Sequence, residues 1–82
     1  MELFRTSHST VHAHHVIESR LLDGTIKNIN PDRITIQSSK YALVATPFGY
    51  EQAKIGDWII MLGDKSLLVM EHNLFKLLYN KY

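Results

Sequence analysis

Two short apolar runs joined by four polar residues constrain the fold of this chain more than any other feature. The runs cover residues 58–62 and 67–70, and Gly63-Asp64-Lys65-Ser66 lies between them. Runs of about five apolar residues bounded by Gly and Asp are typical of strands, and so short a connection is typical of a hairpin. Gly56-Asp57 predicts a further turn just before the first run. We therefore expect a β-hairpin here, with Trp58 anchored in the core.

The length and composition predict a single domain with a small core. The chain has 82 residues, of which 45% are apolar, and this apolar content is too high for a disordered chain. It contains no cysteine, which excludes disulfides, Cys-ligated zinc and thiol chemistry. Because a small domain without such crosslinks often gains core by pairing with a second copy, we expect a homo-oligomer.

The charge pattern does not indicate nucleic acid or a membrane as partner. Nine Lys and Arg stand against eight Asp and Glu, and the two signs are interspersed along the chain. There is no basic run, so binding to a phosphate backbone is not implied. Residues 1–15 lack the apolar segment of a signal peptide, and no run reaches the ~18–20 apolar residues of a membrane span. We expect a cytoplasmic protein.

The first third of the chain leaves alternatives open between strand and helix. Residues 11–17 alternate and contain several β-branched side chains, which favours a strand. Residues 18–29 contain Asp23-Gly24, which is either the turn of a hairpin or the end of one short helix.

The remaining segments predict strands and turns. Residues 33–37 alternate polar and apolar side chains, residues 41–46 form a second apolar strand, and residues 50–55 are a short strand. The last residues are a short helix or a turn followed by an edge strand. We therefore expect an α+β fold, a small strand-rich single domain built on an antiparallel sheet or a partly open barrel, with at most one or two short helices.

Residues 46–50 have the composition of a binding loop. Phe48 and Tyr50 could stack on a base or on a side chain of a partner, and Gly49 lets backbone approach a ligand closely. The alternative is that both rings plug the end of a small core. Because Pro47 and Gly49 make a regular strand improbable, we expect a loop in which Phe48 packs inward and Tyr50 faces solvent.

Basic residues near this loop extend the candidate site. Lys40 and Lys54, with Arg33, could hold the phosphate of a nucleotide whose base stacks on the aromatic rings.

A histidine cluster near the N-terminus is the one constellation with metal-ligand chemistry. Its members are His8, His12, His14 and His15. On a strand His12 and His14 share a face, whereas on a helix His8, His12 and His15 do. Imidazole binds Zn²⁺, Ni²⁺ or Cu²⁺ when neutral. The alternatives are a polar strand that is merely rich in histidine, or a surface whose charge rises below about pH 6.5.

Signatures of catalysis are missing from the sequence. It has no Gly-x-Ser-x-Gly elbow, no Walker loop and no Gly-x-Gly-x-x-Gly. Asp57 follows a Gly and is best interpreted as a turn residue that bonds backbone amides. We therefore expect no enzyme activity and no cofactor.

The second half of the chain carries a set of Gly, Pro and aromatic residues in a recognisable order: Thr46-Pro47-Phe48-Gly49, Gly56-Asp57-Trp58-Ile59-Ile60, Gly63, Phe75 and Tyr79. With these residues, the segment 33–82 resembles the PGDYG-type family, small phage and prophage proteins that share a Pro-Gly-Asp-Tyr or Pro-Gly-Asp-Trp motif. Ile55 departs from the family, which often has Pro at that position.

This resemblance implies a strand-rich α+β fold and a viral origin, and it carries over no catalytic residue. The function that we predict is a phage-encoded accessory protein that binds and inhibits a host protein of the defence or transcription machinery, in the cytoplasm of the host cell and without catalysis. The alternatives are an oligomer that sequesters a nucleotide and a metal-binding domain built on the histidine cluster.

Overall fold

A computed structural model describes residues 2–5, 10–78 and 80–81, with side chains over residues 12–78. These residues form eight strands and three short helices, an α+β arrangement with one helix more than the sequence predicts. The strands are β1 (Glu2–Arg5), β2 (Thr10–His15), β3 (Ile34–Ile36), β4 (Tyr41–Thr46), β5 (Gly49–Lys54), β6 (Trp58–Met61), β7 (Leu67–Met70) and β8 (Asn80–Lys81). The helices are α1 (Glu18–Leu22), α2 (Thr25–Ile29) and α3 (His72–Leu78).

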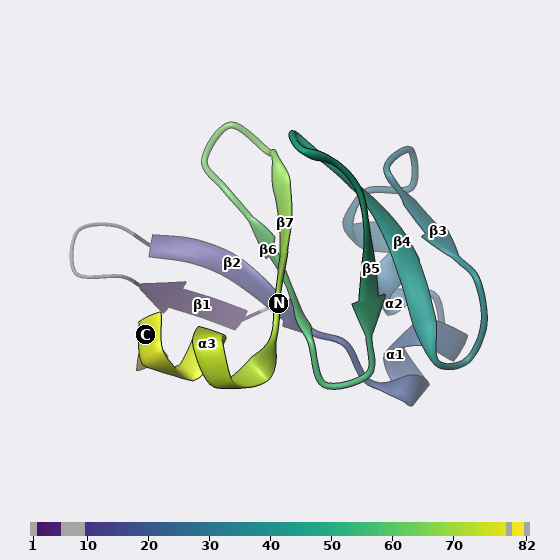
Figure 1. Ribbon diagram of the computed structural model, residues 1–82, viewed down its shortest axis with the longest axis horizontal. Coiled ribbons are helices and arrows are strands. Elements are labelled where there is room, and N and C mark those ends of the chain that lie inside the picture. The colour runs from purple at the N-terminus through teal and green to yellow at the C-terminus, as the bar shows by residue number, and fades with distance from the viewer. Residues whose placement is uncertain (1, 6–9, 79, 82) are drawn as a thin grey trace.

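The strands build two antiparallel sheets. The larger sheet has the order β7-β6-β2-β1-β8 and the smaller has the order β3-β4-β5. Figure 1 shows the two sheets side by side, with α1 and α2 against the smaller sheet and α3 beside the larger one. The predicted α+β fold built on antiparallel sheet is thus confirmed, with the strands divided between two open sheets.

The predicted hairpin is confirmed as β6 and β7. Trp58 pairs with Met70 and Met61 pairs with Leu67 in its antiparallel register. The connecting turn is closed by a hydrogen bond from the amide of Leu62 to the carbonyl of Ser66. Since β6 also pairs with β2, this hairpin joins the N-terminal part of the chain to its C-terminal half.

Residues 11–29, for which the sequence leaves strand and helix open, contain both. β2 confirms the predicted strand, whereas the hairpin alternative for residues 18–29 is wrong. Gly24 ends α1 with a φ of 88°, a conformation that glycine adopts without steric cost. A second helix follows at once, because Leu21 in α1 and Ile26 in α2 must both reach the core and are buried there.

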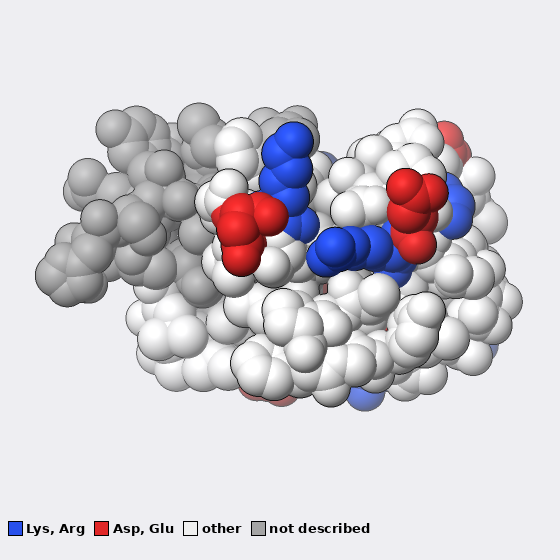
Figure 2. All heavy atoms as spheres, turned by 90° about the horizontal axis from the view of Figure 1, so that it is seen from above, with Lys and Arg blue, Asp and Glu red and all other residues white. Residues whose placement is uncertain are grey.

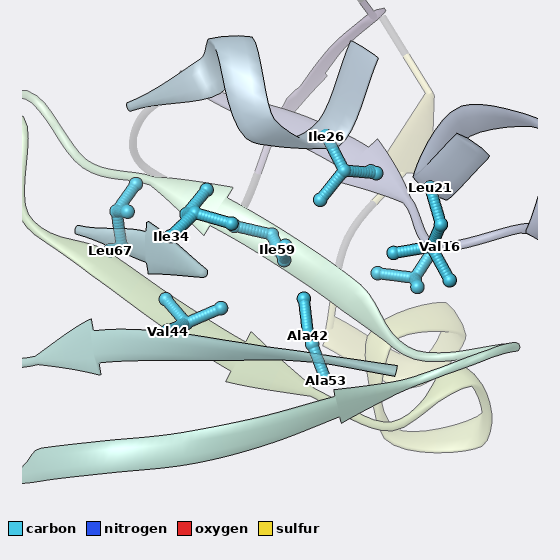
Figure 3. Packing of buried hydrophobic residues seen from close by; sticks show 9 residues of the cluster. All are labelled: Val16, Leu21, Ile26, Ile34, Ala42, Val44, Ala53, Ile59 and Leu67. Carbon is cyan, nitrogen blue, oxygen red and sulfur yellow. The ribbon is translucent and has the colours of Figure 1, made fainter. Parts of the chain in front are cut away.

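The main core cluster lies between the two sheets and the first two helices. Figure 3 shows its side chains pointing toward one another, with Ile59 of β6 among residues from the smaller sheet. The nine buried members are Val16, Leu21, Ile26, Ile34, Ala42, Val44, Ala53, Ile59 and Leu67.

A second cluster covers the opposite face of the larger sheet. It joins Ala13, Trp58 and Ile60 to Phe75 of α3. β6 is therefore buried on both faces, which explains why its sequence is continuously apolar and does not alternate. At the C-terminus both predicted alternatives occur in succession, since α3 is followed by the two-residue strand β8.

Candidate binding surface

The segment expected to be a loop is the turn of a regular hairpin. Thr46 of β4 pairs with Gly49 of β5, and only Pro47 and Phe48 lie between the strands. The amide of Phe48 donates to Oγ1 of Thr46 at 3.1 Å, and that hydroxyl donates to the carbonyl of Gly49 at 2.7 Å. Pro47 is tolerated because its missing N–H falls in the turn and outside the ladder.

Both aromatic rings at this tip face solvent. The side chain of Phe48 is 85% exposed and that of Tyr50 is 75% exposed. The expectation that Phe48 packs inward is therefore wrong, because the strands continue up to the turn and carry Phe48 beyond the end of the core. Neither ring plugs the core.

The smaller sheet has one buried face and one open face. Ala42, Val44 and Ala53 are fully buried on the face that meets the core. The register places Ala45 opposite Tyr50, Leu43 opposite Gln52 and Tyr41 opposite Lys54 on the other face, since alternate residues of a strand point to opposite sides. We call these six residues the outer face.

The predicted site residues do not gather at one point. Phe48, Gly49 and Tyr50 lie at the turn, whereas Lys40 and Lys54 lie at the opposite end of the hairpin. Lys54 lies four positions after Tyr50, a span of about 13 Å at the rise of a strand. The predicted site residues thus form a long surface and do not converge on one point as the residues of a nucleotide pocket would.

Arg33 directly precedes β3, which lies on the other side of β4 from β5. Hydrogen bonds from Ser66 lower the pKa of the Asp64 carboxyl below its ordinary value of 3.8, and the charge of Arg33 adds to this effect. The residues that sequence reasoning missed are Tyr41, Leu43 and Gln52. Alternation within each strand places them on the same face as Tyr50 only when it is combined with the two-residue turn that sets the register.

The predicted histidine cluster is divided between two faces of β2. Alternation puts His12 and His14 on one face and His15 on the other, while His8 lies outside the described residues. His14 is buried opposite Ile59 in the register. Among residues 2–5, 10–78 and 80–81, no three His, Asp or Glu side chains are placed to hold a metal ion.

His15 belongs to a stacked cluster with Trp58, His72 and Phe75. Its ring lies 4.4 Å from that of Trp58 and nearly parallel to it, and the ring of Phe75 lies 4.1 Å from Trp58. Nε1 of Trp58 donates a hydrogen bond to Nδ1 of His72 at 3.0 Å. The prediction that Trp58 anchors the core is confirmed, since it is only 7% exposed. These contacts give His15 a role in packing.

Asp57 acts as the predicted turn residue. Its Oδ2 accepts a hydrogen bond from the amide of Lys54 at 2.9 Å, and its own amide donates to the carbonyl of Lys54. Gly56 beside it has a φ of 99°. The Gly-Asp-aromatic motif therefore closes the end of β5 and starts β6.

Charges of both signs lie beside one another on the face seen in Figure 2, with uncharged surface around them. No helix among the described residues is long and apolar enough to cross a membrane. No family model, curated protein or solved structure matches this chain. The resemblance to the PGDYG-type family stays a prediction.

Proposed function

We propose that this chain is a non-catalytic binding protein that contacts a protein partner through the tip and the outer face of the β4–β5 hairpin. The observation that carries this proposal is the exposure of Phe48 and Tyr50 at the tip. A few residues carry most of the binding energy of a protein interface, and aromatic side chains are prominent in interface energetics because each buries a large apolar area.

The composition of the outer face supports a protein partner. Leu43 and Tyr41 are half-buried there, beside the amide of Gln52 and the ammonium of Lys54. An apolar centre with polar groups at its margin is the usual anatomy of an interface. The outer face contains no carboxylate and no imidazole, and imidazole is the side chain that most often serves in general acid–base catalysis.

The resemblance to phage proteins extends the proposal to the biological role. A phage-encoded accessory protein would use this surface to bind and inhibit a host component of the defence or transcription machinery. Such a role needs affinity and no chemistry, which agrees with the composition of the outer face. Self-association through a homo-oligomer is part of the same proposal, and sedimentation at several concentrations tests it.

Nucleotide sequestration receives less support from the geometry. The aromatic tip and the two lysines lie at opposite ends of the hairpin, so a single nucleotide would not engage both within one subunit. A thermal-shift screen against cyclic nucleotides tests this alternative, since a ligand that binds only the native state raises the melting temperature.

A pull-down from host lysate with matched variants tests the main proposal. We expect the parent to recover one stoichiometric protein and the double variant Phe48→Ala, Tyr50→Ala to lose it. The control is Leu77→Ala, because Leu77 is 81% exposed on α3 and lies away from the hairpin tip. Equal recovery by the double variant and the parent would contradict the proposal.

A further inference from the structure

β5 is an edge strand with one open side. The smaller sheet has the order β3-β4-β5, so within the described part of the chain β5 pairs with β4 alone. The amide of Ile55 donates to the carbonyl of Lys40 at 3.1 Å, which identifies this pair as hydrogen-bonded. Bonded and non-bonded pairs alternate in an antiparallel ladder. The backbone groups of Glu51 and Ala53 therefore bond to β4. Those of Tyr50, Gln52 and Lys54 point away from it.

Hydrogen bonds on the far side of β4 agree with this assignment. The amide of Ala45, which lies opposite Tyr50, donates to the carbonyl of Arg33 at 2.8 Å and thus faces β3. The non-bonded pairs of β4 and β5 are those formed by Tyr50, Gln52 and Lys54. The outward groups of Lys54 are already satisfied by Asp57.

Two adjacent outward positions stay open. The N–H and C=O groups of Tyr50 and Gln52 bond to no other backbone group within residues 2–5, 10–78 and 80–81. Tyr50, Glu51 and Gln52 are all exposed. Together they offer two donors and two acceptors in the spacing of a strand, and the tip aromatics lie at one end of this edge.

We infer that the open edge of β5 binds an extended segment of the partner polypeptide as an additional strand. This inference rests on the proposed function and names its binding mode. Main-chain hydrogen bonds would hold the segment in register, while its side chains alternate between the two faces of the sheet. Phe48 and Tyr50 would then contact the side chains at one end of the added strand.

Charge argues against a second copy of this chain as the occupant. Two copies related by a twofold axis could pair their β5 edges as antiparallel strands. Only one register lets all the open N–H and C=O groups form hydrogen bonds, and it places Tyr50 opposite Gln52 of the other copy. That register sets Glu51 directly opposite Glu51 of the other copy, in a non-bonded pair whose Cα atoms are about 4.5 Å apart. Like charges directly opposite are destabilising.

The neighbouring registers use fewer open groups. Moving the second copy by two residues pairs Tyr50 with Lys54, whose outward groups Asp57 occupies. The opposite shift pairs Gln52 with Phe48, which lies in the turn and whose amide is bonded to Thr46. A partner segment with Lys or Arg opposite Glu51 avoids both problems.

A synthetic peptide with a matched control tests this inference. The probe is a seven-residue peptide of alternating threonine and valine with a central lysine, and the control has glutamate at the centre. We expect the lysine peptide to bind, and the glutamate peptide to bind about fivefold more weakly or worse. Amide exchange of Tyr50 and Gln52 should slow in proportion to the bound fraction, because these two N–H groups enter the new ladder.

Backbone variants separate strand addition from side-chain contact. Gln52→Pro removes one open donor without removing a bond to β4, and an edge strand tolerates proline there. Gln52→Ala keeps the backbone edge and is the control. We expect Gln52→Pro to lose the peptide and Gln52→Ala to retain it with at most a small loss of affinity, because Gln52→Ala removes only the side-chain amide on the outer face. Both variants should melt near the parent temperature.

Three outcomes would overturn strand addition: peptide binding unaffected by Gln52→Pro, saturation without slower exchange at Tyr50 and Gln52, or no binding at millimolar peptide. The lysate pull-down distinguishes this failure from failure of the proposed function. If Gln52→Pro retains the partner that the Phe48 and Tyr50 variant loses, the binding surface stands and strand addition is wrong. If both variants retain it, the proposed function is wrong as well.

Discussion

Among single residues, Trp58 connects three elements. It lies in β6, stacks on His15 of β2 and Phe75 of α3, and donates to Nδ1 of His72. We predict that Trp58→Ala lowers the free energy of unfolding by about 3–5 kcal/mol or prevents folding. Circular dichroism during urea unfolding measures this, since the variant contains no tryptophan for fluorescence.

Trp58→Phe is the matched control for this prediction. It retains an aromatic ring for stacking but loses the N–H donor to His72, so a smaller loss of about 1–3 kcal/mol is expected. A melting temperature of Trp58→Ala within a few degrees of the parent would show that the stacked cluster contributes little to stability.

The stability of the β6–β7 turn depends on pH through the carboxyl of Asp64. Its Oδ1 accepts a hydrogen bond from the amide of Ser66 at 2.9 Å, and bonds from Ser66 lower the pKa of the carboxyl from 3.8. A carboxyl whose pKa is lower when folded binds fewer protons in the folded state. Its stabilisation is therefore complete above about pH 3.8 and is lost as pH falls through the lower folded value.

We expect the melting-temperature difference between the parent and Asp64→Asn to shrink as pH falls from 5 to 2. The asparagine retains an oxygen that can accept from Ser66 but does not titrate, which isolates the effect of the charge. A difference that stays constant over this range would contradict the prediction.

At the scale of elements, α3 has one buried face and one open face. Phe75 is almost fully buried against Trp58, whereas Leu77 is 81% exposed. We predict that Phe75→Ala lowers the free energy of unfolding by about 3–5 kcal/mol, while Leu77→Ala changes it by no more than about 0.5 kcal/mol. Urea unfolding of the two variants in parallel measures the contrast. Similar losses from both would show that α3 packs by another face.

At the scale of the whole molecule, one cluster ties the two sheets together. Ile59 of β6 is fully buried among residues of α1, α2 and the smaller sheet (Figure 3). Since neither sheet has a complete core of its own on this side, we predict that both unfold in one transition. Ile59→Ala should lower the free energy of unfolding by about 2–5 kcal/mol and Ile59→Val by about 0.5–1.5 kcal/mol.

Two probes test this coupling. Fluorescence of Trp58 reports on the larger sheet, and amide exchange of Val44 reports on the smaller sheet. We expect the two probes to agree on the free energy of unfolding of the parent, and to agree again on the lower value for Ile59→Val. A loss confined to one sheet would show that the sheets unfold independently.

Several features of the binding surface follow from local pattern alone. The run of strand formers at residues 41–46 ends at Pro47, and the hydroxyl of Tyr50 favours exposure. The predicted inward packing of Phe48 is wrong because Pro47 and Gly49 belong to a tight hairpin and not to a longer loop. Whether an aromatic ring at a turn packs in the core or faces solvent depends on how far its strands extend beyond the other sheet. This distance cannot be predicted from the residues near the turn.

Elements whose signals are local can be predicted from the amino-acid sequence. The β6–β7 hairpin, the strand at residues 41–46, the Gly56-Asp57 turn and the burial of Trp58 follow from apolar runs and turn chemistry that involve near neighbours. Three features require the three-dimensional structure: the division of the strands into two sheets, the stacking of His15 on Trp58, and the open edge of β5. These features depend on contacts between residues far apart in the chain. Many strand pairings satisfy the same hydrophobic pattern, and the burial of β6 on both faces favours the pairing observed here.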